Sequence, residues 1–87
     1  MSTPTKLVSD DAAKRVISKN IRDALALREW SQKQLAEATG ESTARINHAV
    51  RGRSVPSSAF LQRIALALQL TTDELLREPD EILENRA

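Results

Sequence analysis

One stretch in the middle of the sequence carries an unusually complete set of helix start and stop signals. Ser31 and Gln34 form a capping box, in which each side chain satisfies a backbone N–H group at a helix start. Gly40 can end that helix in a left-handed conformation, and Ser42 can cap another helix directly afterwards. The stretch therefore predicts two short helices joined by a tight turn, with the second helix ending at Gly52.

A longer helix is predicted before this pair. Ser9 or Asp10 can cap it, and an acidic first turn is favourable against the positive N-terminal end of the helix dipole. It should run to about Arg28. Its predicted buried stripe follows helical spacing and consists of Val16, Ile17, Ile21, Ala24 and Leu25.

Two further helices are predicted after the pair. Pro56 and Ser57 open a fourth helix, and a second capping box of Thr71 and Glu74 begins a short fifth one. Pro79 either stops this helix or starts a sixth turn. The buried side of the fourth helix should contain Phe60, Leu61, Ile64, Ala65 and Leu68, and the sixth turn Ile82 and Leu83. Since no strand signal is present, we expect a compact, all-α domain of five helices.

The chain has 87 residues and no cysteine, so we expect a single domain without disulfides or thiolate metal sites. No apolar run approaches the length of a membrane span, and no signal-peptide pattern is present. These features predict a cytoplasmic protein that needs no cofactor, metal or membrane. We expect a flexible arm over residues 1–8, a folded domain over 9–77 and an acidic C-terminal extension over 78–87.

The small net charge of +1 conceals an uneven distribution. Residues 1–72 carry eleven basic and six acidic groups, whereas residues 73–87 carry two basic and six acidic groups. A basic body with an acidic tail is typical of a protein that places one face on phosphate. The pattern alone favours this interpretation only weakly, because many solvated surfaces are equally uneven.

Two short helices joined by a glycine-containing turn match the helix-turn-helix arrangement, in which the second helix enters the major groove of DNA. Here the motif covers residues 31–52. Spacing alone leaves a purely structural helical hairpin open as an alternative, since many such hairpins share it.

The residue types resemble those of the phage Cro and lambda-repressor-like family, also called the XRE type. The resemblance extends from about Ile17 to Leu76, and it implies a five-helix DNA-binding domain that acts as a homodimer on palindromic operators. It also implies a bacterial or phage regulator, with repression expected from the family. It is carried by the stretch 31–36, by Gly40, Ser42, Ile46, Gly52 and Pro56, and by the stretch 64–68.

The helix that follows Ser42 has two different faces. Its predicted inner face contains Ile46, Ala49 and Val50, and its predicted outer face contains Thr43, Ala44, Asn47, His48 and Arg51. Asparagine can pair with adenine through two hydrogen bonds, and threonine or alanine can contact a thymine methyl group. The family resemblance points to Thr43, Ala44 and Asn47 as base-reading residues, and we add His48, for which a phosphate contact is an equal alternative. An idle, solvent-facing amide remains the alternative for Asn47.

Several other residues are candidates for contacts with the DNA backbone. Gln32 resembles the family's glutamine that meets a phosphate at the start of the second helix. Lys33, Arg51 and Arg53 would add attraction that does not depend on base sequence. Each of these charges alone is typical of a solvated surface, so the prediction rests on the cluster.

Three residues depart from the family pattern. Glu41 occupies a position that is usually apolar, and it should either read a cytosine amino group or weaken binding to DNA. Ala49 replaces a larger apolar residue, and Val50 stands where glutamate is common. These differences leave the angle of the recognition helix open.

Two other classes of function were compared with DNA binding. An enzyme is not expected, because His48 is the only histidine and no catalytic constellation or phosphate loop can be assembled. The main alternative is an antitoxin-like or other protein-interaction module with a protein partner. An apolar patch of Leu66, Leu76, Ile82 and Leu83 would serve that role, would form a dimer contact, or would simply close the core. For the dimer we expect the fifth helix and the extension, with Leu76, Ile82 and Leu83.

Overall fold

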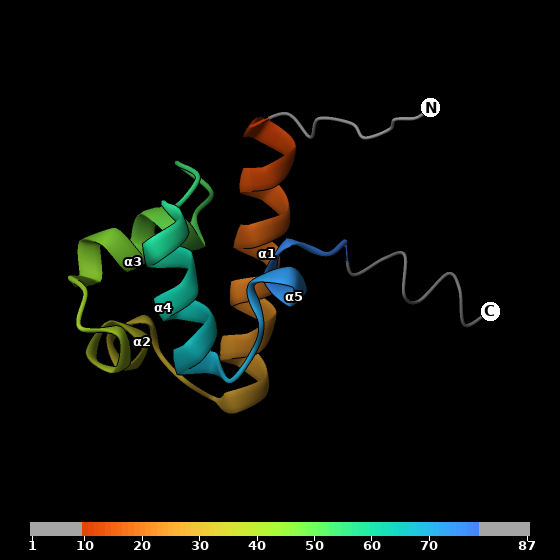
Figure 1. Ribbon diagram of the computed structural model, residues 1–87. Coiled ribbons are helices and arrows are strands. Elements are labelled where there is room, and N and C mark those ends of the chain that lie inside the picture. Colours follow the sequence, from red (N-terminus) through yellow and green to blue (C-terminus); the bar gives the residue numbers. More distant parts are fainter. Residues whose placement is uncertain (1–9, 79–87) are drawn as a thin grey trace, which may run out of the picture.

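The computed structural model describes residues 10–78, and this range contains five α-helices and no strand (Figure 1). They are α1 (Asp10–Arg28), α2 (Gln32–Thr39), α3 (Thr43–Val50), α4 (Ser58–Leu68) and α5 (Thr72–Leu76). The prediction of an all-α, five-helix domain is confirmed. Ser9, the predicted arm and the predicted sixth turn lie outside the described residues.

Three helices begin at predicted capping residues, and α4 begins after one of the two residues that were predicted to open it. In each case the cap side chain accepts a hydrogen bond from the backbone N–H three residues further along, and the caps are Ser31, Ser42, Ser57 and Thr71. Both predicted capping boxes are complete. Pro56 lies before the cap of α4 rather than within the helix, because Ser57 is the cap and Ser58 is the first helical residue.

The five helices enclose one apolar core. The predicted stripe of α1 is buried along its whole length. Side chains with almost no exposed surface come from all five helices: Ile17, Ile21, Leu35, Ile46, Ile64, Leu68 and Leu75. In the described range, none of the helices has the length and apolar character that crossing a membrane requires.

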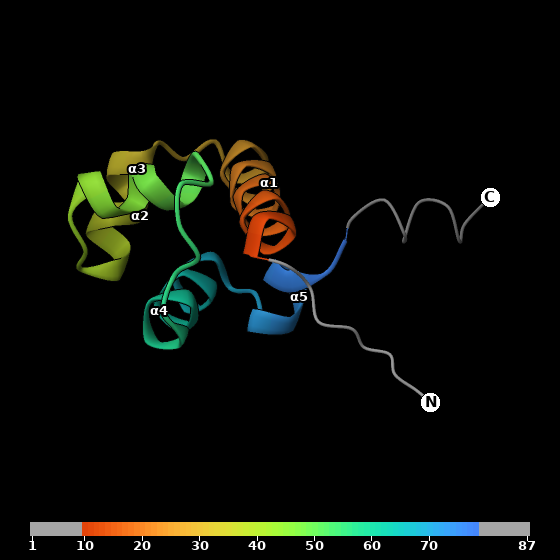
Figure 2. The ribbon, with the colours of Figure 1, turned by 90° about the horizontal axis from the view of Figure 1, so that it is seen from above.

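The long helix α1 lies beside both α3 and α5, while α2 packs against α3 and α4. Seen from above, α1, α2 and α3 occupy one side of the domain, and α4 and α5 occupy the other (Figure 2). Within the first group α3 contacts both α1 and α2. Its buried residues, Ile46, Ala49 and Val50, lie on one side, so only one of its faces meets the core.

Polar side chains of α1 satisfy carbonyl groups at the ends of three other helices. Ser18 Oγ donates to the carbonyl of the last residue of α3 at 2.5 Å, and Arg28 donates to that of the last residue of α4. Asn20 Nδ2 donates to the Leu75 carbonyl near the end of α5 at 2.7 Å. The last carbonyl groups of a helix have no hydrogen-bond partner within it, so α1 supplies donors to the C-terminal ends of the three shorter helices.

Four residues after helices adopt a left-handed backbone conformation. Gly40 and Gly52 do so as predicted, with φ of 76° and 69°. A Cβ atom on Gly52 would lie 3.4 Å from the Lys14 carbonyl oxygen of α1, so this glycine also permits a close approach between two segments. Glu29 and Gln69, with φ of 57° and 60°, were not predicted to be left-handed.

Replacing Glu29 with glycine should raise the free energy of unfolding by about 0.5–1 kcal/mol. In a left-handed conformation the Cβ atom of a residue is strained, and glycine has no Cβ atom. The strain that is relieved exceeds the extra conformational entropy that glycine loses on folding. The Glu29 side chain is exposed and lies in none of the ion pairs between residues 10 and 78. Urea-induced unfolding followed by circular dichroism measures the change.

The matched control is Glu37→Gly, which places the same new residue inside α2 at an exposed position. There glycine should lower the free energy of unfolding by about 1 kcal/mol. Equal losses of stability in the two variants would contradict the assigned backbone conformation at Glu29.

Candidate nucleic-acid interface

The pair α2–α3 is held together by the turn between the two helices. The backbone N–H groups of Gly40 and Glu41 both donate to the Ala36 carbonyl, at 2.9 and 3.1 Å. Leu35 of α2 and Ile46 of α3 are fully buried and pack in the same core cluster. The sequence from Ser31 to Gly52 therefore forms the predicted pair of short helices with a tight glycine turn.

The two predicted faces of α3 are confirmed. Ile46, Ala49 and Val50 are buried. Of the predicted outer face, Asn47 is partly buried, and Thr43, Ala44, His48 and Arg51 are exposed; Arg45, which was assigned to neither face, is exposed as well. This helix of eight residues thus presents mostly short or polar side chains to solvent from its first turn to its last. Such a face is narrow enough for a groove about 12 Å wide.

A hydrogen bond connects two residues that the sequence assigned to different tasks. Asn47 Nδ2 donates to Gln32 Oε1 at 3.0 Å, which ties α3 to the first residue of α2. The amide of Asn47 keeps its carbonyl oxygen and one N–H for another partner, and these two groups match the edge of adenine. Gln32 keeps its own amide N–H groups, which suit a phosphate oxygen.

Cations lie at both ends of this surface. Lys33 follows Gln32 in the first turn of α2, and Arg51 and Arg53 flank Gly52 after α3. All three side chains belong to exposed residues, and none takes part in an ion pair within residues 10–78. They are available to an external anion.

Glu41 does not present a free carboxylate, so the expectation that it reads a cytosine amino group finds no support. Its side chain is only 11% exposed and forms ion pairs with Arg45 and Arg63 at 2.7 and 2.5 Å. The hydrogen bond from Arg63 lowers the pKa of Glu41 below its usual value; desolvation opposes this shift, and the charge of Arg45 adds to it. Sequence reasoning missed both pairs.

Candidate metal sites and buried polar atoms without a partner are both absent from the part of the chain that the structure describes. No group of three or more histidine, cysteine or acidic residues between 10 and 78 could hold a metal ion. The same range contains no buried side-chain polar atom without a hydrogen-bond partner.

A short exposed polar helix, fixed by a capped partner helix and flanked by unpaired cations, defines a helix-turn-helix DNA-binding protein. The chain belongs to the helix-turn-helix family HTH_3, whose model matches residues 21–75. This match confirms the resemblance to XRE-type proteins, and the protein is a DNA-binding transcriptional regulator.

The solved structures that are similar to this one include two proteins described as a transcription factor and a transcriptional regulator. A hypothetical transcription factor, NHTF, from Neisseria is 25% identical, with a TM-score of 0.80 and 97% of each chain covered. An HTH_3 family transcriptional regulator from Vibrio cholerae is 26% identical, with a TM-score of 0.76. The match covers 88% of this chain but 43% of the Vibrio chain. A search of curated proteins gives no match.

Proposed function

We propose that this protein is a sequence-specific repressor that binds a palindromic operator in double-stranded DNA as a homodimer, with α3 in the major groove. The observation that carries the proposal is the polar face of α3, on which Asn47 is oriented by its 3.0 Å hydrogen bond to Gln32. A side chain that is oriented before binding loses less freedom when it pairs with a base.

The proposed roles follow the geometry of the surface. Thr43, Ala44, Asn47 and His48 read base edges, since they occupy the outward side of α3. Gln32, Lys33, Arg51 and Arg53 contact phosphates on either side of the groove. No catalytic step, cofactor or metal is part of the proposal, and the site of action is the bacterial cytoplasm.

The homodimer is proposed to form through α5 and the residues that follow it. Leu76 is 49% exposed at the end of α5, while Ile82 and Leu83 lie outside the described residues. A two-fold axis at this place would relate two copies of α3 and match the symmetry of a palindrome. Sedimentation of the protein at micromolar concentration, with and without DNA, tests this: a monomer in both conditions would contradict it.

Replacing Arg53 with alanine should weaken binding to all duplex sequences alike. The guanidinium contributes one phosphate contact, so the slope of log affinity against log salt concentration should fall by about 1. Fluorescence anisotropy with a labelled mixed-sequence duplex measures both quantities. Lys19→Ala is the control, because that lysine belongs to α1 and is paired with Asp23 at 3.1 Å. An equal effect of both changes would contradict the assigned role of Arg53.

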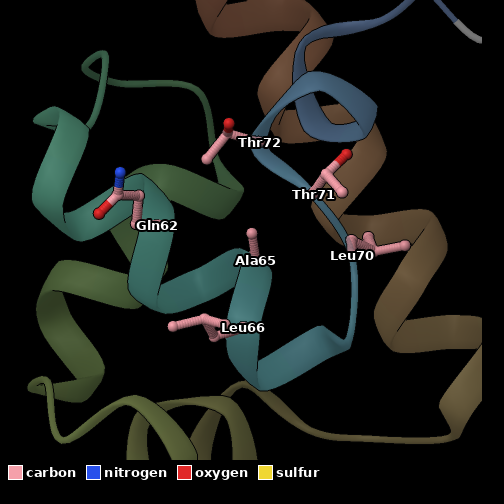
Figure 3. A pocket seen from close by; sticks show the side chains of 6 residues that line it. All are labelled: Gln62, Ala65, Leu66, Leu70, Thr71 and Thr72. Atoms are coloured by element: carbon pink, nitrogen blue, oxygen red, sulfur yellow. The ribbon is translucent and has the colours of Figure 1, made fainter.

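A second candidate function, a protein-interaction module, is favoured by one observation. Leu66 of α4 is 76% exposed, so the interpretation that it closes the core is wrong. It borders a shallow groove of about 290 Å³ between α4 and the start of α5 (Figure 3). The test is capture of a protein expressed from the same operon. Capture by wild-type protein that is lost in Leu66→Ser, while DNA binding stays intact, would support this function.

A further inference from the structure

In the turn between α2 and α3, both carboxylate oxygens of Glu41 accept hydrogen bonds from arginine side chains. Arg45 Nη1, in the first turn of α3, donates to Glu41 Oε1 at 2.7 Å. Arg63, on α4, donates to Glu41 Oε2 from Nε at 3.0 Å and from Nη2 at 2.5 Å. The Arg45 guanidinium also lies 4.4 Å from the centre of the Phe60 ring, which is a favourable cation–π distance.

These contacts occur beside the base-reading face. Arg45 precedes His48 by three residues on α3, and residues three apart are neighbours on the surface of a helix. Salt screens charges over about 8 Å at physiological ionic strength. A phosphate beside the start of α3 would therefore respond to the charges of Arg45 and Glu41.

Cations that belong to the α2–α3 pair, follow it directly or bind its turn fall into two groups. Lys33, Arg51 and Arg53 make no ion pair within the described range, whereas Arg45 and Arg63 are both held by one carboxylate. A free arginine would pair with a phosphate of any sequence, because its planar guanidinium matches phosphate oxygens. Arg45 and Arg63 are paired with Glu41 instead.

We propose that Glu41 is a specificity-determining residue, which restrains sequence-independent DNA binding by holding Arg45 and Arg63 on the protein surface. This inference rests on the proposed function. Contacts to phosphate strengthen binding to every sequence, while contacts to bases strengthen binding to the operator alone. Withholding two cations from phosphate therefore widens the ratio between operator affinity and affinity for other DNA.

The test compares wild-type protein with Glu41→Gln, a change of nearly equal size that removes the negative charge. The probes are a mixed-sequence duplex and the duplex recovered by selection with wild-type protein, each titrated at several salt concentrations. Binding of Glu41→Gln to the mixed-sequence duplex should be about 3- to 10-fold tighter, with a salt slope steeper by about 1 to 2. Affinity for the selected duplex should change less, so the specificity ratio falls.

Two further variants separate release of arginines from a general change in charge. Glu37→Gln removes an exposed carboxylate of α2 that has no ion pair within the described range, and it should leave the salt slope unchanged. Arg45→Gln should have little effect in wild-type protein but should remove most of the gain in the Glu41→Gln background. This non-additivity is the signature of a restrained cation.

Several outcomes would overturn the inference. Weaker binding of Glu41→Gln to both duplexes, with a lower melting temperature, would show that Glu41 only stabilises the fold. Equal gains in Glu41→Gln and Glu37→Gln would show a general charge effect. If Glu41→Gln does not fold, Arg63→Gln tests the inference instead. Its affinity for the mixed-sequence duplex should fall by less than 2-fold. A larger fall would show that Arg63 already contacts DNA in wild-type protein. Failure of wild-type protein to bind any duplex would contradict the proposed function itself.

Discussion

Replacing Leu35 with alanine is expected to lower the free energy of unfolding by about 2–5 kcal/mol. Leu35 is 0% exposed and lies in the core cluster that joins α2 to the other helices. The substitution removes apolar contacts and leaves a cavity that the rigid surroundings fill only in part. Because 1 kcal/mol shifts the melting temperature of a domain of this size by about 4–8 °C, the melting temperature should fall by at least about 8 °C.

Leu27→Ala is the matched control, since it makes the same chemical change at a residue that is 82% exposed. Its effect should stay within about 0.5 kcal/mol. Chemical denaturation of both variants measures the difference directly. Similar losses of stability in the two variants would mean that α2 does not pack as the structure describes.

Replacing Asn47 with alanine is expected to weaken binding to the preferred operator by about 1–3 kcal/mol and to relax the choice of base at one position. The change removes the amide that would pair with a base and also the hydrogen bond to Gln32. Affinity for mixed-sequence DNA should change much less, because the phosphate contacts are kept. Anisotropy titrations with the operator and its single-base variants measure both effects.

Gln62→Ala is the control, because it removes an exposed amide from α4, away from α3. It should leave binding to the operator unchanged. If Asn47→Ala also left operator affinity and base choice intact, α3 would not lie in the groove in the proposed orientation.

The course of the chain was largely predictable because its helices are marked by local signals. Ser31, Ser42 and Thr71 each cap a helix in the structure as predicted. A cap acts on backbone groups only three residues away, so its effect can be inferred without knowledge of the tertiary structure.

Features that depend on distant parts of the chain were not predictable in the same way. The bonds from α1 to the ends of α3, α4 and α5 join residues that are 32, 40 and 55 positions apart. Glu29 gave no sign of its left-handed conformation, because glycine usually marks such a position. Its conformation follows from how α1 must turn to reach α2.

In the candidate site, too, local features were predictable and contacts between distant residues were not. Helical spacing alone separated the buried and exposed faces of α3, because burial repeats with the helical period. The Asn47–Gln32 hydrogen bond and the Arg63–Glu41 pair span 15 and 22 residues and depend on how neighbouring helices pack. Without Arg63 in view, Glu41 could be interpreted only as a reader of cytosine or as a repulsive charge.

Selection of bound duplexes from a randomised DNA pool at about 0.15 M salt, where sequence-independent attraction is partly screened, tests the central claim most directly. We predict recovery of a palindrome whose half-sites lie about one helical turn apart, as expected for two copies of α3 related by a two-fold axis. Recovery of unenriched sequences, with only weak and strongly salt-sensitive binding, would contradict a sequence-specific regulator and would favour the protein-interaction function.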